Sequence, residues 1–464
     1  MSSETLQANR ALFWKRRLVT LAILFQATFL RQLGVLRLTG LFGILLFAFW
    51  MGMSPHWEYP YPLHVDEWFH IGYGQSTLFA GSLQYLSPYE ERIISTHPEM
   101  GFHLLWAILK AVTGLTFMEI YRLAPGFLLA LLAFFTYAAG RRDGYGWGSA
   151  LFVAVIPTSL WTLGPAFVVP VSTAMLFIPL TILLINIMSD GKQSESLWLM
   201  LILVGGTLFV HPTTEAVVTA LVGLYIGSLI LDAIGQKQYR NTARLLVALG
   251  FRMLAPILAL GIWLPSLSQS VIHWSTLGEQ ASFWFPHGLK DNFVDAFGKG
   301  AILLGVVGVI PFIARGAFSY RNLILPFVTL GLIAFLFLYP RYFYGPPPLF
   351  NRGWPILGLL LAIFAGYAVE TYFNGISSLN KFANKRFSVS QKKLLFLRGG
   401  LWLVGSAAVF IILITSLFFN ERRKEYANYY HVVNETVTDH YAWLGRYAGP
   451  EGWVAMAEPS MGWA

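Results

Sequence analysis

The sequence predicts an all-α integral membrane protein, and two observations lead to that prediction. The first is composition: of 464 residues, 56% are hydrophobic and only 12% are charged, and the mean hydropathy is +0.58. A soluble domain of this length could not bury so much apolar surface. The second is a series of apolar runs near the length of about 20 residues that a helix needs to cross a bilayer.

About eleven of these runs are predicted to be transmembrane helices. The first, at residues 35–53, is followed by a long polar loop at 54–122. The others lie at 123–140, 146–163, 167–188, 197–210, 215–231, 246–264, 300–314, 323–339, 354–372 and 400–419. Together they form one membrane domain over residues 1–419. Residues 420–464 are a short tail outside the membrane, which we interpret as the opening of a truncated outer domain.

Two further apolar segments, 18–30 and 101–115, are too short to span and are predicted to lie in the membrane interface. Orientation follows from Lys and Arg, which favour cytoplasmic loops. With residues 15–17 (Lys-Arg-Arg) inside and eleven spans, the basic cluster at 381–398 is also inside and the 54–122 loop is outside. The sequence therefore predicts a multi-pass protein of the cell membrane with a cytoplasmic N-terminus.

The formal net charge of +9 has a simple cause in this arrangement. Basic loops face an anionic inner leaflet, so the lipid bilayer is the expected partner and no nucleic acid is required. The chain has no cysteine, which excludes disulfides, thiolate metal sites and cysteine nucleophiles.

The first outer loop carries the most specific pattern. It begins with His64-Val65-Asp66-Glu67-Trp68-Phe69-His70, and residues 66–80 are predicted to form an amphipathic surface helix. A second motif, His97-Pro98-Glu99-Met100-Gly101-Phe102-His103, leads into the interfacial segment at 101–115. Two acids and several imidazoles are thus placed where the chain leaves the bilayer, and catalytic groups concentrate in loops held by a rigid scaffold.

This order of motifs resembles the GT-C superfamily of polytopic glycosyltransferases, which includes protein O-mannosyltransferases, the lipid-A aminoarabinose transferase and the oligosaccharyltransferase catalytic subunit. The resemblance implies a bundle with a large first outer loop, in which an acid acts on the acceptor. It also implies basic residues in a late outer loop that hold the phosphate of a polyprenyl-linked sugar donor. Asp66 and Glu67 match the first feature, and Arg341 and Arg352 match the second.

The resemblance is incomplete in one respect. The short loop at Gly164-Pro165-Ala166-Phe167 lacks the second acidic motif that many metal-dependent relatives carry. The sequence therefore supports a divalent metal only weakly, and it assigns no cofactor.

Chemistry suggests the same roles for the acids and arginines. Glycosyl transfer from a lipid phosphate needs a base for the acceptor proton, and a carboxylate can serve; we assign Asp66 as the base and Glu67 as a partner of sugar hydroxyls. A guanidinium fork suits the departing phosphate. The alternatives are a solvated acidic pair and arginines that snorkel to headgroups. Arg352 is predicted at the start of a helix, where the dipole disfavours a cation, so an anionic partner is favoured there.

The remaining polar residues are assigned to substrate binding. His64, His70, His97, Glu99 and His103 are predicted to bind sugar or relay protons, and their spacing is not that of a metal site. The helix before His211 is short, so the turn at 211–215 is predicted to lie below the membrane surface. There His211 and Glu215 either form a polar patch on the floor of a cavity or hold the turn by a hydrogen bond between them.

The function predicted from the sequence is a glycosyltransferase. It would move a sugar from a polyprenyl-phosphate donor to a glycan, lipid or protein acceptor at the outer face. A transporter or flippase of lipid-linked glycans is the main alternative, and a non-catalytic assembly subunit is another.

Overall fold

The computed structural model describes residues 35–237, 299–314, 320–342, 347–386 and 391–422, with gaps at 58, 87–92, 95–96, 98, 157–163 and 190–192, and the single positions 243, 433, 436, 439 and 443. The predictions for residues 18–30 and 246–264, and for nearly all of the tail after 422, lie outside the described residues.

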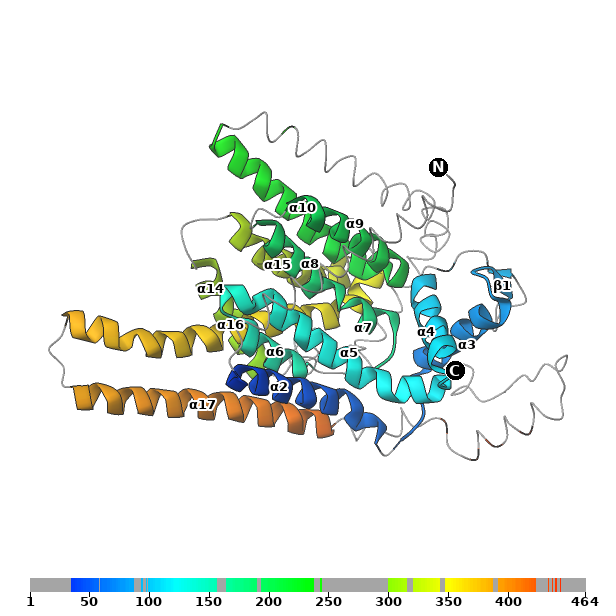
Figure 1. Cartoon of the computed structure of the whole chain (residues 1–464), viewed down its shortest axis with the longest axis horizontal. Helices are drawn as coiled ribbons and strands as arrows, with labels where there is room; N and C mark the ends of the chain where they lie inside the picture. The colour runs from blue at the N-terminus through cyan, green and yellow to red at the C-terminus, as the bar shows by residue number, and fades with distance from the viewer. Residues whose placement is uncertain are drawn as a thin grey trace, which may run out of the picture.

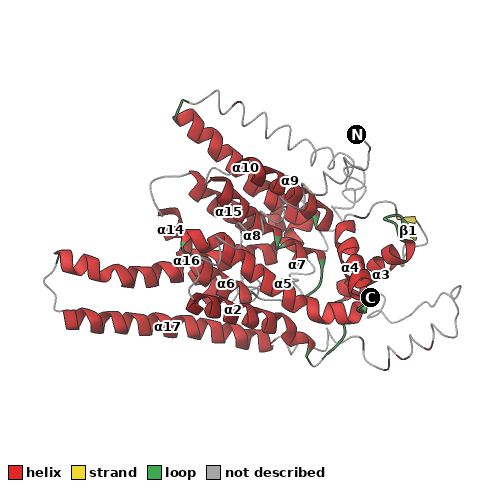
Figure 2. Ribbon diagram, viewed as in Figure 1, coloured by secondary structure: helices red, strands yellow, loops and turns green. Residues whose placement is uncertain are grey.

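The described part is a bundle of helices with one small β-hairpin beside it (Figures 1 and 2). The bundle helices are α2 (Val35–Met53), α5 (Phe117–Gly140), α6 (Gly146–Ala154), α7 (Pro170–Ala174), α8 (Phe177–Ser189), α9 (Gln193–Val210), α10 (Pro212–Gly235), α14 (Lys299–Ala314), α15 (Tyr320–Tyr342), α16 (Pro347–Arg386) and α17 (Gln391–Arg422). Among the described residues, seven helical segments are long and apolar enough to cross a membrane. An all-α membrane protein is thereby confirmed.

Every predicted span except 246–264 coincides wholly or in part with a described helix. Several boundaries differ, and two of these differences concern the candidate site. The span predicted at 167–188 is interrupted, because α7 ends at Ala174 and α8 begins at Phe177. The helix predicted to start near 354 begins at Pro347. Arg352 therefore lies in the second turn of α16, and the dipole argument for a position at its very start does not apply.

The first outer loop forms a separate group of elements at one end of the bundle (Figure 1). It contains α3 (Val65–Ala80), the antiparallel pair β1 (Tyr85–Leu86) and β2 (Ile93–Ile94), and α4 (Met100–Thr113). Helix α3 begins within one residue of its prediction. Helix α4 is amphipathic, because Phe102 and Trp106 are buried whereas Ile108 and Val112 are exposed. That pattern suits the predicted interfacial helix.

Helix α16 lies at the centre of the bundle and positions Arg352. Its residues Leu357, Leu360 and Phe364 are each 0% exposed. On one side α6 approaches so closely that a Cβ on Gly366 would overlap the backbone of Ser149, and the Ser149 hydroxyl donates to the Ile363 carbonyl at 2.9 Å. Close backbone contact of this kind is typical of packed membrane helices. This contact fixes α16 against α6 along the middle of both helices.

Candidate functional site

The first turn of α3 is stabilised by the side chains of His64 and Glu67. His64 is the N-cap residue, and its Nδ1 accepts a hydrogen bond from the Asp66 backbone at 3.1 Å. Glu67 Oε2 accepts from the backbone N–H groups of Leu63 at 2.7 Å and His64 at 3.0 Å, which completes a capping box. The orphan donors of the first turn are thus satisfied within the loop.

Glu67 also ties α3 to a distant loop. Its Oε1 accepts a hydrogen bond from the Val168 backbone at 2.7 Å, and the side chain is 0% exposed. Burial raises the pKa of Glu67 to about 7, against the lowering effect of the three backbone donors. Both carboxylate oxygens are occupied inside the protein, so a contact with sugar hydroxyls does not fit. We replace that predicted role by a positioning role.

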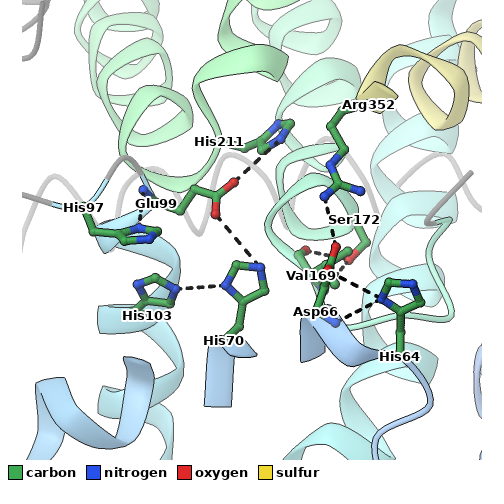
Figure 3. Close-up of polar contacts among 10 residues, drawn as sticks. All are labelled: His64, Asp66, His70, His97, Glu99, His103, Val169, Ser172, His211 and Arg352. Atoms are coloured by element: carbon green, nitrogen blue, oxygen red, sulfur yellow. Dashed lines mark hydrogen bonds and ion pairs between the residues drawn. The ribbon is translucent and has the colours of Figure 1, made fainter. Parts of the chain in front are cut away.

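The Asp66 side chain points in a different direction from that of Glu67 and forms an ion pair with an arginine from the other half of the chain. Arg352 Nη2 lies 2.9 Å from Asp66 Oδ2 (Figure 3), although the two residues are 286 positions apart in the sequence. The Asp66 side chain is 31% exposed and the Arg352 side chain is 34% exposed. The base predicted in the first loop and the phosphate ligand predicted in the late loop are thus in direct contact and accessible.

A second polar group lies beside this ion pair. Glu99, the residue that precedes α4, lies between two imidazoles: its Oε2 is 4.0 Å from His70 Nε2 and its Oε1 is 3.9 Å from His211 Nε2 (Figure 3). His70 Nδ1 and His103 Nε2 are hydrogen-bonded at 3.0 Å. His97 Nδ1 accepts from the Glu99 backbone at 3.1 Å. Two imidazoles thus face the Glu99 carboxyl group, and His97 and His103 contact the Glu99 backbone and His70, respectively.

The electrostatics of this group favour neutral side chains. Burial lowers the pKa of His211 to about 3 and holds the pKa values of His70 and His103 well below the ordinary range. Burial raises the pKa of Glu99 to about 7, against the lowering effect of Arg352. Burial therefore favours uncharged imidazoles at His70, His103 and His211 and the protonated form of Glu99.

The donor atoms do not fit a metal centre. Within the described residues, no group of three or more His, Asp or Glu side chains has the arrangement of a metal site, and the chain has no cysteine. The imidazole and carboxylate atoms around Glu99 lie at ion-pair distances from one another rather than around a common point. The roles proposed for these residues therefore involve no metal ion.

Two predicted residues stand apart from this cluster. Arg341 belongs to the last turn of α15, and its side chain lies outside the described part of the structure. Glu215 is buried on α10, where its Oε1 accepts from Thr219 at 2.7 Å and its Oε2 has no hydrogen-bond partner among the described residues. The predicted hydrogen bond between His211 and Glu215 is wrong, because His211 Nδ1 pairs with Thr214.

Sequence reasoning missed two contributors to the site. Tyr73 stacks on His103 with ring centroids 5.1 Å apart and lies 4.7 Å from the His97 ring. It follows Asp66 by seven residues on α3, so helical periodicity placed it on the same face. The Val168 amide carries no side-chain signal, and no sequence pattern could have found it.

The comparisons with known proteins agree with this architecture. No protein-family model matches the chain, and no curated protein matches its sequence. The fold is similar to that of an archaeal oligosaccharyltransferase. The apo crystal structure of the Archaeoglobus fulgidus enzyme has a TM-score of 0.56 and 14% identity, over 89% of this chain and 58% of that one.

Two further crystal structures of the same protein match to a similar extent. The form tethered to an acceptor peptide with an NVT sequon has a TM-score of 0.57 and 13% identity, over 89% of this chain and 57% of that chain. The complex with Zn and sulfate has a TM-score of 0.51 and 14% identity, over 88% and 56%. This chain thus spans less than two thirds of its structural neighbour's length. At such identities the likeness shows the fold alone.

Proposed function

We propose that this protein is a GT-C-type glycosyltransferase that moves a sugar from a polyprenyl-phosphate donor to a glycan, lipid or protein acceptor. The observation that carries the proposal is the contact between Asp66 and Arg352 at 2.9 Å. It joins a carboxylate suited to an acceptor proton with a guanidinium suited to a phosphate, at the end of a membrane bundle. The distribution of Lys and Arg among the loops supports an extracytoplasmic site in the cell membrane.

The ion pair also suggests how the two substrates are used. A donor phosphate is a stronger bidentate partner for Arg352 than a carboxylate that is one-third exposed. When the phosphate occupies the guanidinium, Asp66 loses its counter-ion and becomes a better base. Asp66 then takes the proton of the acceptor as the acceptor attacks the anomeric carbon. Arg352 stabilises the negative charge that grows on the departing phosphate.

Substitutions of the pair test the proposal. Asp66→Asn keeps the shape but removes the base, so sugar transfer should fall by about 10²-fold or more. Binding of the donor should be as tight as in the parent or tighter, because Arg352 no longer has a competing carboxylate. Arg352→Ala should weaken donor use about ten- to a hundredfold, since a hydrogen bond to a charged group contributes about 1.5 to 3 kcal/mol, and Arg352→Lys should lose less.

The measurement uses purified protein in liposomes with a radiolabelled polyprenyl-phosphate sugar, scored for glycosidic product and for donor binding. Asp232→Asn is the matched control, because Asp232 lies near the C-terminal end of α10, about 30 Å along that helix from His211. Full transfer by Asp66→Asn would contradict the assignment of the base. Movement of the lipid-linked sugar across the membrane by the parent, with no glycosidic product, would support a transporter instead.

A further inference from the structure

We propose that Glu99 is the general acid of this glycosyl transfer, donating a proton to the phosphate oxygen that leaves the sugar. This inference rests on the proposed function and adds a second catalytic carboxyl group to it. In the proposed site Asp66 acts on the acceptor side and Glu99 acts on the phosphate side.

The position of Glu99 suits a group that contacts the donor phosphate. It precedes the first turn of α4, yet its side chain makes no capping hydrogen bond with that helix. The carboxyl group instead points toward His70 and His211 (Figure 3), and Arg352 is close enough to act on it electrostatically. Its side chain is 23% exposed, whereas Glu67 is 0% exposed. Glu99 can therefore meet a ligand of Arg352, and Glu67 cannot.

The hydrogen bonds of the surrounding imidazoles determine which ring nitrogens carry a proton on the side that faces Glu99. His211 Nδ1 accepts from the Thr214 backbone at 3.2 Å, so the neutral ring carries its proton on Nε2, the atom that faces Glu99 Oε1. That N–H suits the carbonyl oxygen of a protonated carboxyl group. The opposite oxygen, Oε2, faces His70 Nε2.

His70 can serve both protonation states of Glu99. Its Nδ1 is bonded to His103 Nε2, and the proton of that bond can sit on either ring. If it sits on His70 Nδ1, then Nε2 has a lone pair that accepts the O–H of a protonated Glu99. If it sits on His103 Nε2, then a neutral His70 carries its own proton on Nε2, the atom that suits an ionised Glu99. The two arrangements are alternative tautomers and not steps of the transfer, because each ring keeps one proton and the buried Nδ1 of His103 has no hydrogen-bond partner in the described residues.

The charged groups around Glu99 act on its pKa in opposite directions. Arg352 and Asp66 both act on Glu99, in opposite directions, and burial outweighs them to raise the pKa of Glu99 to about 7. The nearby imidazoles of His70 and His211 are neutral in this range. A carboxyl group whose environment favours its protonated form is suited to act as a general acid. A pKa of about 7 is also close to the second pKa of a phosphate monoester, about 6.

The chemical step balances without another reactant. The acceptor oxygen bonds to the anomeric carbon and gives its proton to Asp66. The bond from that carbon to the phosphate oxygen breaks, and its electron pair stays on the oxygen. Glu99 passes its proton to the same oxygen, so a polyprenyl phosphate leaves with one proton. Asp66 and Glu99 then return to their starting states by proton exchange with water.

The first test is the pH dependence of transfer by the parent, Glu99→Gln and Glu119→Gln at saturating donor. The acid works only when protonated, so the parent rate should fall as pH rises through about 7. Glu99→Gln cannot donate a proton in this way. Its kcat below that pH should be about 10²-fold lower, the alkaline fall should be absent, and donor binding should stay within a few-fold of the parent. Glu119→Gln, an exposed capping residue of α5, should keep the parent profile.

The second measurement reads the proton directly. The infrared difference spectrum of the parent on either side of pH 7 should contain a protonated-carboxyl band that Glu99→Gln lacks. A parent rate in Glu99→Gln, an unmoved alkaline fall, or no such band would each overturn the general acid while leaving glycosyl transfer intact. A parent protein that forms no glycosidic product with any donor and acceptor would overturn the proposed function and this inference together.

Discussion

The N-terminal end of α3 and the contact between α6 and α16 are stabilised in the same way for different purposes. At the start of α3, Glu67 accepts hydrogen bonds from three backbone N–H groups. Between α6 and α16, Glu370 accepts the backbone N–H of Gly148, in the first turn of α6, at 2.7 Å. Each carboxylate satisfies donors that a helix N-terminus leaves open.

The two regions differ in what lies next to the structural carboxylate. Beside Glu370 the helices meet backbone to backbone at Gly366 and Ser149, which leaves no room for a ligand. The residue that precedes Glu67, Asp66, is partly exposed and faces Arg352. The contact between α6 and α16 therefore holds the bundle together, whereas at the start of α3 a buried acid, Glu67, positions an accessible one, Asp66. Substitutions should therefore affect stability in the first region and both stability and activity in the second.

The largest expected loss of stability comes from closing the space between α6 and α16. A Cβ on Gly366 would overlap the backbone of Ser149 and Gly148, so Gly366→Ala must push the helices apart. We expect a loss of about 3 kcal/mol or more, at the upper end for overpacking, measured by thermal unfolding in detergent. Gly375→Ala on the same helix is the control, since nothing lies within 4 Å of its Cβ. Equal unfolding temperatures for the two variants would contradict the close packing.

Glu67→Gln should have the next largest effect. The amide nitrogen would replace one accepting oxygen and face a backbone N–H of Leu63, His64 or Val168. A buried donor left unsatisfied costs about 1 to 3 kcal/mol, and transfer should also fall because Asp66 is no longer held in place. Unfolding and transfer are measured on one preparation, with the exposed Glu119→Gln as control. If Glu67→Gln were as stable as the parent but inactive, Glu67 would have a chemical role after all.

Glu370→Gln should have the smallest effect of the three substitutions. Oε1 of Glu370 accepts the Gly148 N–H, a bond that the amide oxygen of Gln can also accept. The backbone of Trp147 is a second donor to the same carboxylate, so Glu370 accepts two backbone N–H groups where Glu67 accepts three. The expected change in stability is below about 1 kcal/mol, with transfer unchanged. A loss as large as that of Glu67→Gln would mean that charge, rather than the number of accepting oxygens, decides both sites.

Local parts of the structure were predictable from the sequence. Helix α2 has the predicted bounds, and α3 starts one residue before its prediction, because hydropathy and helical periodicity depend on neighbouring residues. The motif at 97–103 does lead into a surface helix. The opposite roles of Asp66 and Glu67 were not predictable, since adjacent residues on a helix point about 100° apart. Which of them faces the interior depends on where the Val168 loop lies.

The class of protein, the positions of most helices and the placement of most acids, histidines and arginines outside the apolar runs follow from the sequence alone. Those properties come from composition and from patterns over a few turns. Only the tertiary structure decided that Asp66 meets Arg352 across 286 residues, that Glu67 is enclosed, and that His70 and His211 lie on either side of Glu99. Such pairs depend on how the helices pack, and packing is set by the shapes of many side chains and glycines together.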